Sequence, residues 1–149
     1  ASAFATLLAL AALALPAGLA GPRATEGVPA AAETLDWRPL DAAAIAGLVA
    51  QGQVVFVDVT ADWCITCQVN KKLAITDTVS AGLEAAGVVR MRGDWTLPSD
   101  AISRYLEGFG RYGIPFNAVY GPGAPQGLAL PEILTEEAVL TAMTRAAGG

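Results

Sequence analysis

The sequence predicts an α/β domain in which a mixed central sheet carries helices on both faces. Helical and strand patterns alternate along most of the chain, which is typical of sheets with helices packed on each side. The strand predicted over 53–60 is apolar at both alternating sets of positions, as expected of a central strand covered on both faces. The last two predicted strands are joined by a turn rich in Gly and Pro, which indicates a hairpin.

The composition fits one globular domain with a tail. Domains commonly have about 100 to 150 residues, and this chain has 149. Hydrophobic residues make up 54% of it and charged residues 15%, so it can bury a sizeable core and is not disordered as a whole. The net charge of -5 offers no basic surface for DNA or RNA, so nucleic acid is not an expected partner. The absence of His excludes Ser-His-Asp and Cys-His catalysis and most zinc enzymes.

The first residues have a different character from the rest. Residues 1–20 are mostly Ala and Leu and carry no charge, which suits either the end of a transmembrane segment or a secretory signal peptide. We favour the membrane segment, because no basic residues precede the run; a buried helix is a third alternative. Residues 21–34 carry no apolar period and are predicted to be a linker. The folded domain is then expected over 35–147.

The first half of this domain contains three predicted helices around one strand. Asp41 is placed to cap a helix over 42–50, and the strand over 53–60 follows. A helix is expected to begin at Cys64 and to continue to residue 73. Asp77 and Thr78 introduce another short helix, over 79–86.

The second half begins with a strand over 88–92. Ser99 or Asp100 caps the next helix, whose apolar residues fall at i, i+3, i+4 and i+7. A strand is predicted over 116–120, a turn over 121–127, and an edge strand over 128–134, where Pro131 is tolerated. Thr135 caps a last helix over 136–146.

Cys64 and Cys67 are the only cysteines, and they follow a buried strand at the first turn of a predicted helix. The N–H groups and the dipole at a helix start favour an anion, so the pKa of the Cys64 thiol is expected to be lowered. Cys64 would then act as the nucleophile. Cys67, one turn later, would be shielded and would attack a mixed disulfide formed at Cys64.

Two other interpretations of the pair are weaker. An inert disulfide or two buried thiols would require no chemistry, but the position after a strand favours redox activity. A zinc site would need about four ligands, and the chain offers no further Cys and no His, so no metal site is predicted.

Asp58 lies inside the apolar strand, six residues before Cys64. An ionised carboxylate there is unfavourable unless it is paired or hydrated. Near the second thiol it could accept the proton of Cys67 as a general base. The alternative is an Asp at a strand bulge, bonded to backbone N–H groups.

Three further residues are candidates for contact with a substrate. Trp63 either forms the lip of a partner groove or is a core aromatic residue. Ile114 and Pro115 precede a strand, where a cis peptide would let backbone groups face the cysteines; the general frequency of X-Pro isomers predicts trans. Arg90, Arg92 and Arg111 are interpreted as solvated charges.

The residues around the cysteines resemble a known family. The run Phe56 to Cys67, with Gly113-Ile114-Pro115 further on, is similar to a thioredoxin-fold active site. Ala61 to Cys64, Gly93-Asp94-Trp95-Thr96 and the Tyr112 to Pro115 run more closely resemble the C-terminal periplasmic domain of DsbD-type thiol:disulfide interchange proteins, including their ScsB-like branch. The resemblance covers about residues 35 to 146.

This resemblance implies a thioredoxin-like fold and protein-disulfide reductase activity. Cys64 and Cys67 would cycle between dithiol and disulfide without an organic cofactor. They would take electrons from a membrane-embedded domain of the same polypeptide and give them to oxidised periplasmic proteins, with the domain tethered to the bacterial inner membrane. It also implies that Pro115 is cis opposite the cysteines and that Asp58 tunes them.

One residue departs from the family's pattern. DsbD carries an acidic residue four positions after the second cysteine, and this chain has Lys71 there. A cation at that place would favour thiolates.

Two alternative functions stay open on the sequence. The chain could be a membrane-tethered peptide-binding or chaperone-like module with a static disulfide. It could also be a stand-alone secreted thioredoxin-like or cytochrome-maturation reductase.

Overall fold

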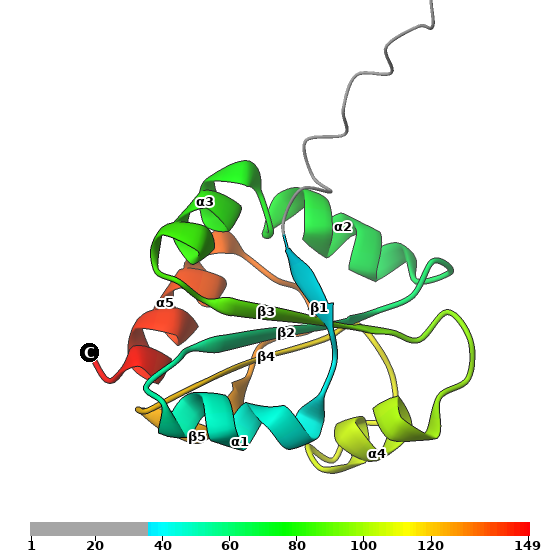
Figure 1. The fold of residues 1–149 in the computed structure, drawn as a ribbon. Coiled ribbons are helices and arrows are strands. Elements are labelled where there is room, and N and C mark those ends of the chain that lie inside the picture. The colour runs from blue at the N-terminus through cyan, green and yellow to red at the C-terminus, as the bar shows by residue number, and fades with distance from the viewer. Residues whose placement is uncertain (1–35) are drawn as a thin grey trace, which may run out of the picture. The chain divides into compact units, whose positions relative to one another are not determined.

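The computed structural model describes residues 36–149, which form a five-stranded sheet with helices around it (Figure 1). The strand order is β1-β3-β2-β4-β5. β1 and β2 both run parallel to β3, β4 is antiparallel to β2, and β5 is antiparallel to β4. The predicted mixed sheet is therefore confirmed. The strands are β1 (Trp37–Pro39), β2 (Val55–Thr60), β3 (Val89–Asp94), β4 (Phe116–Gly121) and β5 (Ala124–Ala129).

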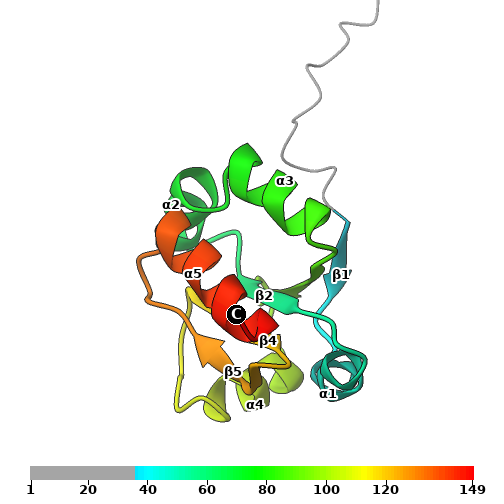
Figure 2. The same ribbon diagram turned by 90° about the vertical axis from the view of Figure 1, so that its left-hand side faces the viewer.

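Helices cover both faces of the sheet, as predicted. α1 and α4 lie on one side, and α2, α3 and α5 lie on the other (Figures 1 and 2). No helix within residues 36–149 has the length and apolar character that a membrane crossing requires. The helices are α1 (Ala42–Ala50), α2 (Ile65–Leu73), α3 (Asp77–Ala85), α4 (Asp100–Glu107) and α5 (Glu136–Ala147).

The central strand β2 explains why the core has two halves. All six of its residues are buried, as expected of a strand covered on both faces. Val55, Val57 and Val59 pack in one cluster with residues of α1 and α4. Phe56 packs in a second cluster with residues of α3 and α5. Because side chains alternate along a strand, Asp58 shares the face of Phe56, on which α2 also lies.

Local capping sets most of the helix starts. The side chain of Asp41 accepts hydrogen bonds from the backbone N–H groups of Ala43 and Ala44, and Ser99 and Thr135 cap α4 and α5 in the same way. These three predicted caps are confirmed. The predicted start of α3 is wrong by two residues, because Thr76 is its N-cap and the helix begins at Asp77.

The expectations for the edges of the sheet are wrong in two places. The short strand β1 was not predicted, because its three residues include Pro39 and give no alternating pattern. The last strand is β5, not 128–134, so it lies mostly in the stretch predicted as a turn. An edge strand tolerates Pro125. Gly127 has φ +85°, and a Cβ there would lie 2.6 Å from the Tyr120 ring, so glycine is required at this position.

The predicted membrane or signal segment over 1–20 and the linker over 21–34 lie outside the described residues. The domain boundaries at 35 and 147 stay a prediction.

Candidate active site

Cys64 and Cys67 form a disulfide at the start of α2, with their Cα atoms 5.2 Å apart. Cys64 is the N-cap of the helix, and its Sγ accepts a hydrogen bond of 3.2 Å from the backbone N–H of Cys67. The two residues are 6% and 2% exposed. Once the disulfide is reduced, the helix start would stabilise a thiolate at Cys64. Cys67 would lie beneath it with less access to solvent.

The loop before β4 contacts the disulfide. The Ile114–Pro115 peptide is cis, as the resemblance implies and unlike the isomer that the general frequency predicts. Ile114 packs against the small cluster of Ala61, Cys64 and Cys67. The chain segments that end β2 and begin β4 therefore meet at the cysteine pair.

Trp63 is exposed directly before Cys64. Its exposed fraction is 61%, so the interpretation as a core aromatic residue is wrong. Ile65, on the other side of Cys64, and Tyr112, two residues before Ile114, are each 81% exposed. Large apolar side chains are therefore exposed in both chain segments that meet at the cysteine pair. Whether Trp63 binds a substrate stays a prediction.

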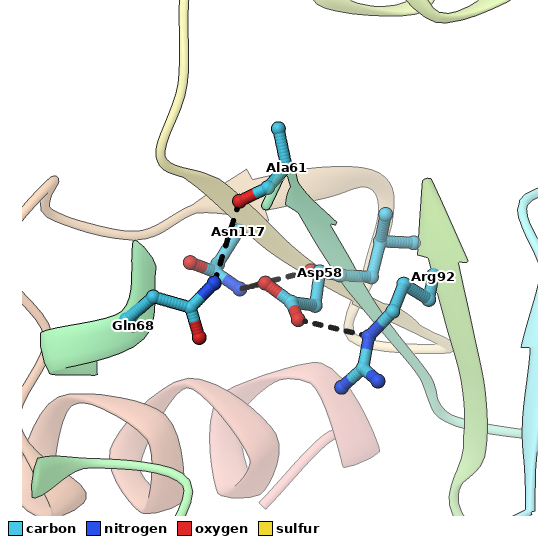
Figure 3. A network of polar contacts seen from close by, with 6 residues as sticks. Asp58, Ala61, Gln68, Arg92 and Asn117 are labelled. Atoms are coloured by element: carbon cyan, nitrogen blue, oxygen red, sulfur yellow. Dashed lines mark hydrogen bonds and ion pairs between the residues drawn. The ribbon is translucent and has the colours of Figure 1, made fainter. Parts of the chain in front are cut away.

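Asp58 is buried and paired through both carboxylate oxygens (Figure 3). Its Oδ1 accepts a hydrogen bond of 3.0 Å from the side-chain amide of Asn117, and its Oδ2 accepts one of 3.3 Å from Nε of Arg92. Asn117 on β4 and Arg92 on β3 are its partners in the strand registers. Asp58 therefore lies in regular strand structure, not at a bulge. The two donors offset the loss of hydration that burial imposes on a carboxylate.

The sequence interpretation of Arg92 is wrong. It was interpreted as a solvated charge, but it forms an ion pair with Asp58 and its guanidinium lies 4.2 Å from the centre of the Trp37 ring. Arg111 forms an exposed ion pair with Glu132. Arg90 lies on the same face of β3 and is 8% exposed, so its interpretation as a solvated charge is also wrong. The sequence alone does not show which residue of β2 lies opposite each arginine.

Asn117 was also missed. It is 2% exposed and lies within β4, whose residues are all buried. A polar residue in an otherwise apolar strand is the same signal that identified Asp58, so it could have been found. A further contact in Figure 3 links α2 to the loop before it, since the side chain of Gln68 donates to the carbonyl of Ala61 over 3.4 Å.

Lys71 is the other charged group near the buried acid. It is half-buried on α2, and burial lowers the pKa of its ammonium below the usual value of 10.5. The negative charge of Asp58 acts in the opposite direction but is the smaller effect. Within residues 36–149, no cluster of three or more His, Cys, Asp or Glu side chains is placed to hold a metal ion.

Comparison with known proteins agrees with this geometry. Residues 36–122 match the model of a protein family described as thioredoxin-like. The chain is 31% identical over 118 residues to the thiol:disulfide interchange protein DsbD 1 of Pseudomonas aeruginosa. That alignment covers 75% of this chain and 18% of the relative, so the chain spans less than a fifth of the relative's length. The resemblance to DsbD-type proteins is confirmed.

Solved structures share the fold. The oxidised C-terminal domain of DsbD from Neisseria meningitidis has a TM-score of 0.56 at 17% identity, with 73% of this chain and 98% of that domain covered. A thioredoxin from Thermus thermophilus has a TM-score of 0.54 at 23% identity, with 74% and 85% covered. The predicted thioredoxin-like fold is therefore confirmed.

Proposed function

This chain belongs to the thioredoxin-like family, and from that premise we propose that it is a disulfide reductase domain that passes electrons from a membrane domain to periplasmic proteins. Its family and its DsbD relative make it a thiol-disulfide oxidoreductase. The observation that carries the proposal is the disulfide between Cys64 and Cys67 at a helix start, on the sheet face that also carries a buried acid.

The reaction has two exchange steps. The Cys64 thiolate attacks one sulfur of a partner disulfide, which releases the other partner sulfur as a thiolate and leaves a mixed disulfide. Cys67 then loses its proton and attacks Sγ of Cys64. The second partner thiolate leaves, and the Cys64–Cys67 disulfide forms again. Two electrons pass to the partner, whose thiolates take up two protons.

The proposed role of Asp58 belongs to the second step. A carboxylate on the same face as α2 could accept the proton of Cys67 as that thiol attacks. Trp63, Ile114 and Pro115 are the proposed contacts for the partner, because Trp63 is exposed beside Cys64 and Ile114 packs against the pair. Thiol–disulfide exchange needs no organic cofactor and no metal.

The proposed electron donor is a membrane-embedded domain of the same polypeptide. The uncharged run over 1–20 supports a membrane tether. The DsbD relative is named as an interchange protein and is several times longer than the matched region, which leaves room for such a domain. The same similarity supports thioredoxin-like or disulfide-bearing proteins as acceptors and a periplasmic location at the bacterial inner membrane.

Equilibration of the full chain in glutathione redox buffers, followed by thiol alkylation, tests the proposal. A reversible two-electron couple at about -270 mV is expected of a domain that donates electrons, whereas a value of about -120 mV would indicate an oxidase. A pair that resists reduction throughout would overturn the catalytic proposal and leave the peptide-binding module with a static disulfide.

Variants of each cysteine sharpen the test. In a Cys67→Ser variant, Cys64 should form a mixed disulfide with a partner protein that persists, because no second thiol resolves it. The matched Cys64→Ser variant should trap far less of the same partner. Equal trapping by both variants would contradict the assignment of Cys64 as the nucleophile.

A further inference from the structure

Lys71 lies on the face of α2 that is turned toward the sheet. Cys67, Asn70, Lys71 and Ala74 follow the spacing i, i+3, i+4 and i+7, which places them on one helical face. The other three are buried and Lys71 is half-buried, whereas Lys72 is exposed. Lys71 thus follows Cys67 by one turn on the buried side of the helix.

Four charged groups from neighbouring segments act electrostatically on the Lys71 ammonium. They are Asp58 on β2, Asp62 in the loop before the disulfide, and Arg92 and Asp94 on β3. Burial and Arg92 lower the pKa of Lys71, and the three carboxylates raise it. Among residues 36–149, no carboxylate oxygen lies within the 4.0 Å ion-pair distance of this ammonium.

Both oxygens of the buried Asp58 carboxylate already accept hydrogen bonds from other residues. Arg92 and Asn117 each donate to one oxygen of Asp58, so the charges of Asp58 and Arg92 largely offset each other. Of the remaining groups, Asp62 and Asp94 are exposed, where solvent screens their charges strongly, and Lys71 is the one that is partly buried. Solvent therefore screens its charge less than a surface charge.

We propose, on the premise that the cysteine pair exchanges disulfides as described above, that Lys71 is a positioning residue whose positive charge favours the Cys67 thiolate during the second step. The Cys67 thiol gives its proton to solvent or to Asp58, its thiolate attacks Sγ of Cys64, and the partner thiolate leaves. The ammonium keeps its protons and acts through its charge alone.

The size of the effect follows from the chemistry of thiolates. Loss of a nearby cation raises the pKa of a thiol, and a rise of about one unit would reduce the thiolate fraction roughly tenfold. A more basic thiolate is also a stronger nucleophile, with a Brønsted slope of about 0.4 to 0.5. Each remaining thiolate therefore attacks about threefold faster, which offsets part of the loss. A Lys71→Gln substitution should therefore slow the second step roughly threefold at neutral pH.

Stopped-flow reaction of the reduced full chain with dithiobis(nitrobenzoate) separates the two steps. Attack by Cys64 releases one coloured thiolate at a rate that depends on reagent concentration. Attack by Cys67 on the mixed disulfide releases the second with a first-order rate. We expect Lys71→Gln to lower this first-order rate and to move its pH profile toward higher pH. Lys71→Arg should restore both, and Lys72→Gln, with the same charge change on the exposed side of the helix, should leave both unchanged.

Other results would overturn either the role of Lys71 or the proposed function. An unchanged first-order rate and pH profile in Lys71→Gln would overturn the role of Lys71, as would an equal effect of Lys72→Gln. Failure of Lys71→Arg to restore the rate would assign the effect to packing and also overturn it. If Lys71→Gln does not fold, Lys71→Met, which has a similar length and no charge, provides the same comparison. A wild-type protein that never releases the second thiolate would overturn the proposed function itself.

Discussion

The side-chain amide of Asn117 donates to Oδ1 of Asp58 over 3.0 Å, although the two residues are 59 positions apart. They are direct partners in the antiparallel register of β2 and β4, and their exposed fractions are 2% and 4%. The strand that carries Asn117 begins one residue after Pro115. This contact therefore joins the buried acid to the segment that packs against the disulfide.

Replacement of Asn117 by Leu should destabilise the protein. Leu has a similar size but no donor, so Oδ1 of Asp58 would stay buried without a partner. A loss of about 1 to 3 kcal/mol in the free energy of unfolding is expected, measured by urea denaturation of the oxidised protein. In an Asp58→Ala background the same replacement should cost at least about 0.5 kcal/mol less. Additive losses would show that the hydrogen bond contributes nothing specific.

Replacement of Arg92 by Met should also destabilise the fold, because Oδ2 of Asp58 loses its ion pair. We expect a loss of about 1 to 3 kcal/mol in the free energy of unfolding. The Arg111–Glu132 pair provides the comparison, since the side chain of Glu132 is 66% exposed. Glu132→Gln should change stability by no more than about 1 kcal/mol. Equal losses in the two variants would mean that burial of Asp58 does not matter.

Replacement of Asp58 by Asn should slow the resolution of the mixed disulfide. Asn cannot accept the proton of Cys67, and general base catalysis contributes about 100-fold or more to proton-transfer steps. The first-order phase of the dithiobis(nitrobenzoate) reaction should fall by this order at neutral pH. Asp62→Asn serves as the control, because it removes an equal charge from an exposed residue. If Asp58→Asn does not slow the phase, or slows it no more than Asp62→Asn does, the general-base role of Asp58 is contradicted, because loss of a negative charge alone would favour the Cys67 thiolate.

The sequence predicts the elements whose signals are local. The caps at Asp41, Ser99 and Thr135 bond backbone groups two or three residues away, so a short window contains the whole interaction. β2 is recognisable from its apolar run. β1 and β5 are not, because edge strands depend on pairing with distant strands and can contain Pro39 or Pro125.

The residues of the candidate site likewise include some that local sequence signals reveal and others that depend on strand pairing. Cys64 and Cys67 are found from their spacing, and Asp58 from its charge within an apolar strand. The partners of Asp58 depend on register, since Arg92 lies 34 positions away and Asn117 59 positions away. No local pattern shows which residues two strands place opposite each other. The exposure of Trp63 likewise depends on the path of a loop.

A buried tyrosine pair should make stability sensitive to alkaline pH. The hydroxyl groups of Tyr105 and Tyr120 lie 2.8 Å apart, and burial raises the pKa of both. Unfolded tyrosines lose their protons near pH 10, whereas these two keep theirs in the folded protein. The unfolded state then binds fewer protons, so stability is full below pH 10 and falls as pH rises above it, by up to about 1.4 kcal/mol per pH unit for each group.

Urea denaturation of Tyr105→Phe at increasing pH tests this relationship. The variant should lose about 1 kcal/mol at neutral pH, because Tyr120 is left without its partner. Its stability should then fall less steeply than that of the wild type above pH 10, since one of the two groups that keep their protons on folding is gone. Tyr112→Phe is the matched control, because Tyr112 is 81% exposed, and it should keep the wild-type slope. Parallel curves for wild type and Tyr105→Phe would show that the buried pair does not cause the alkaline loss.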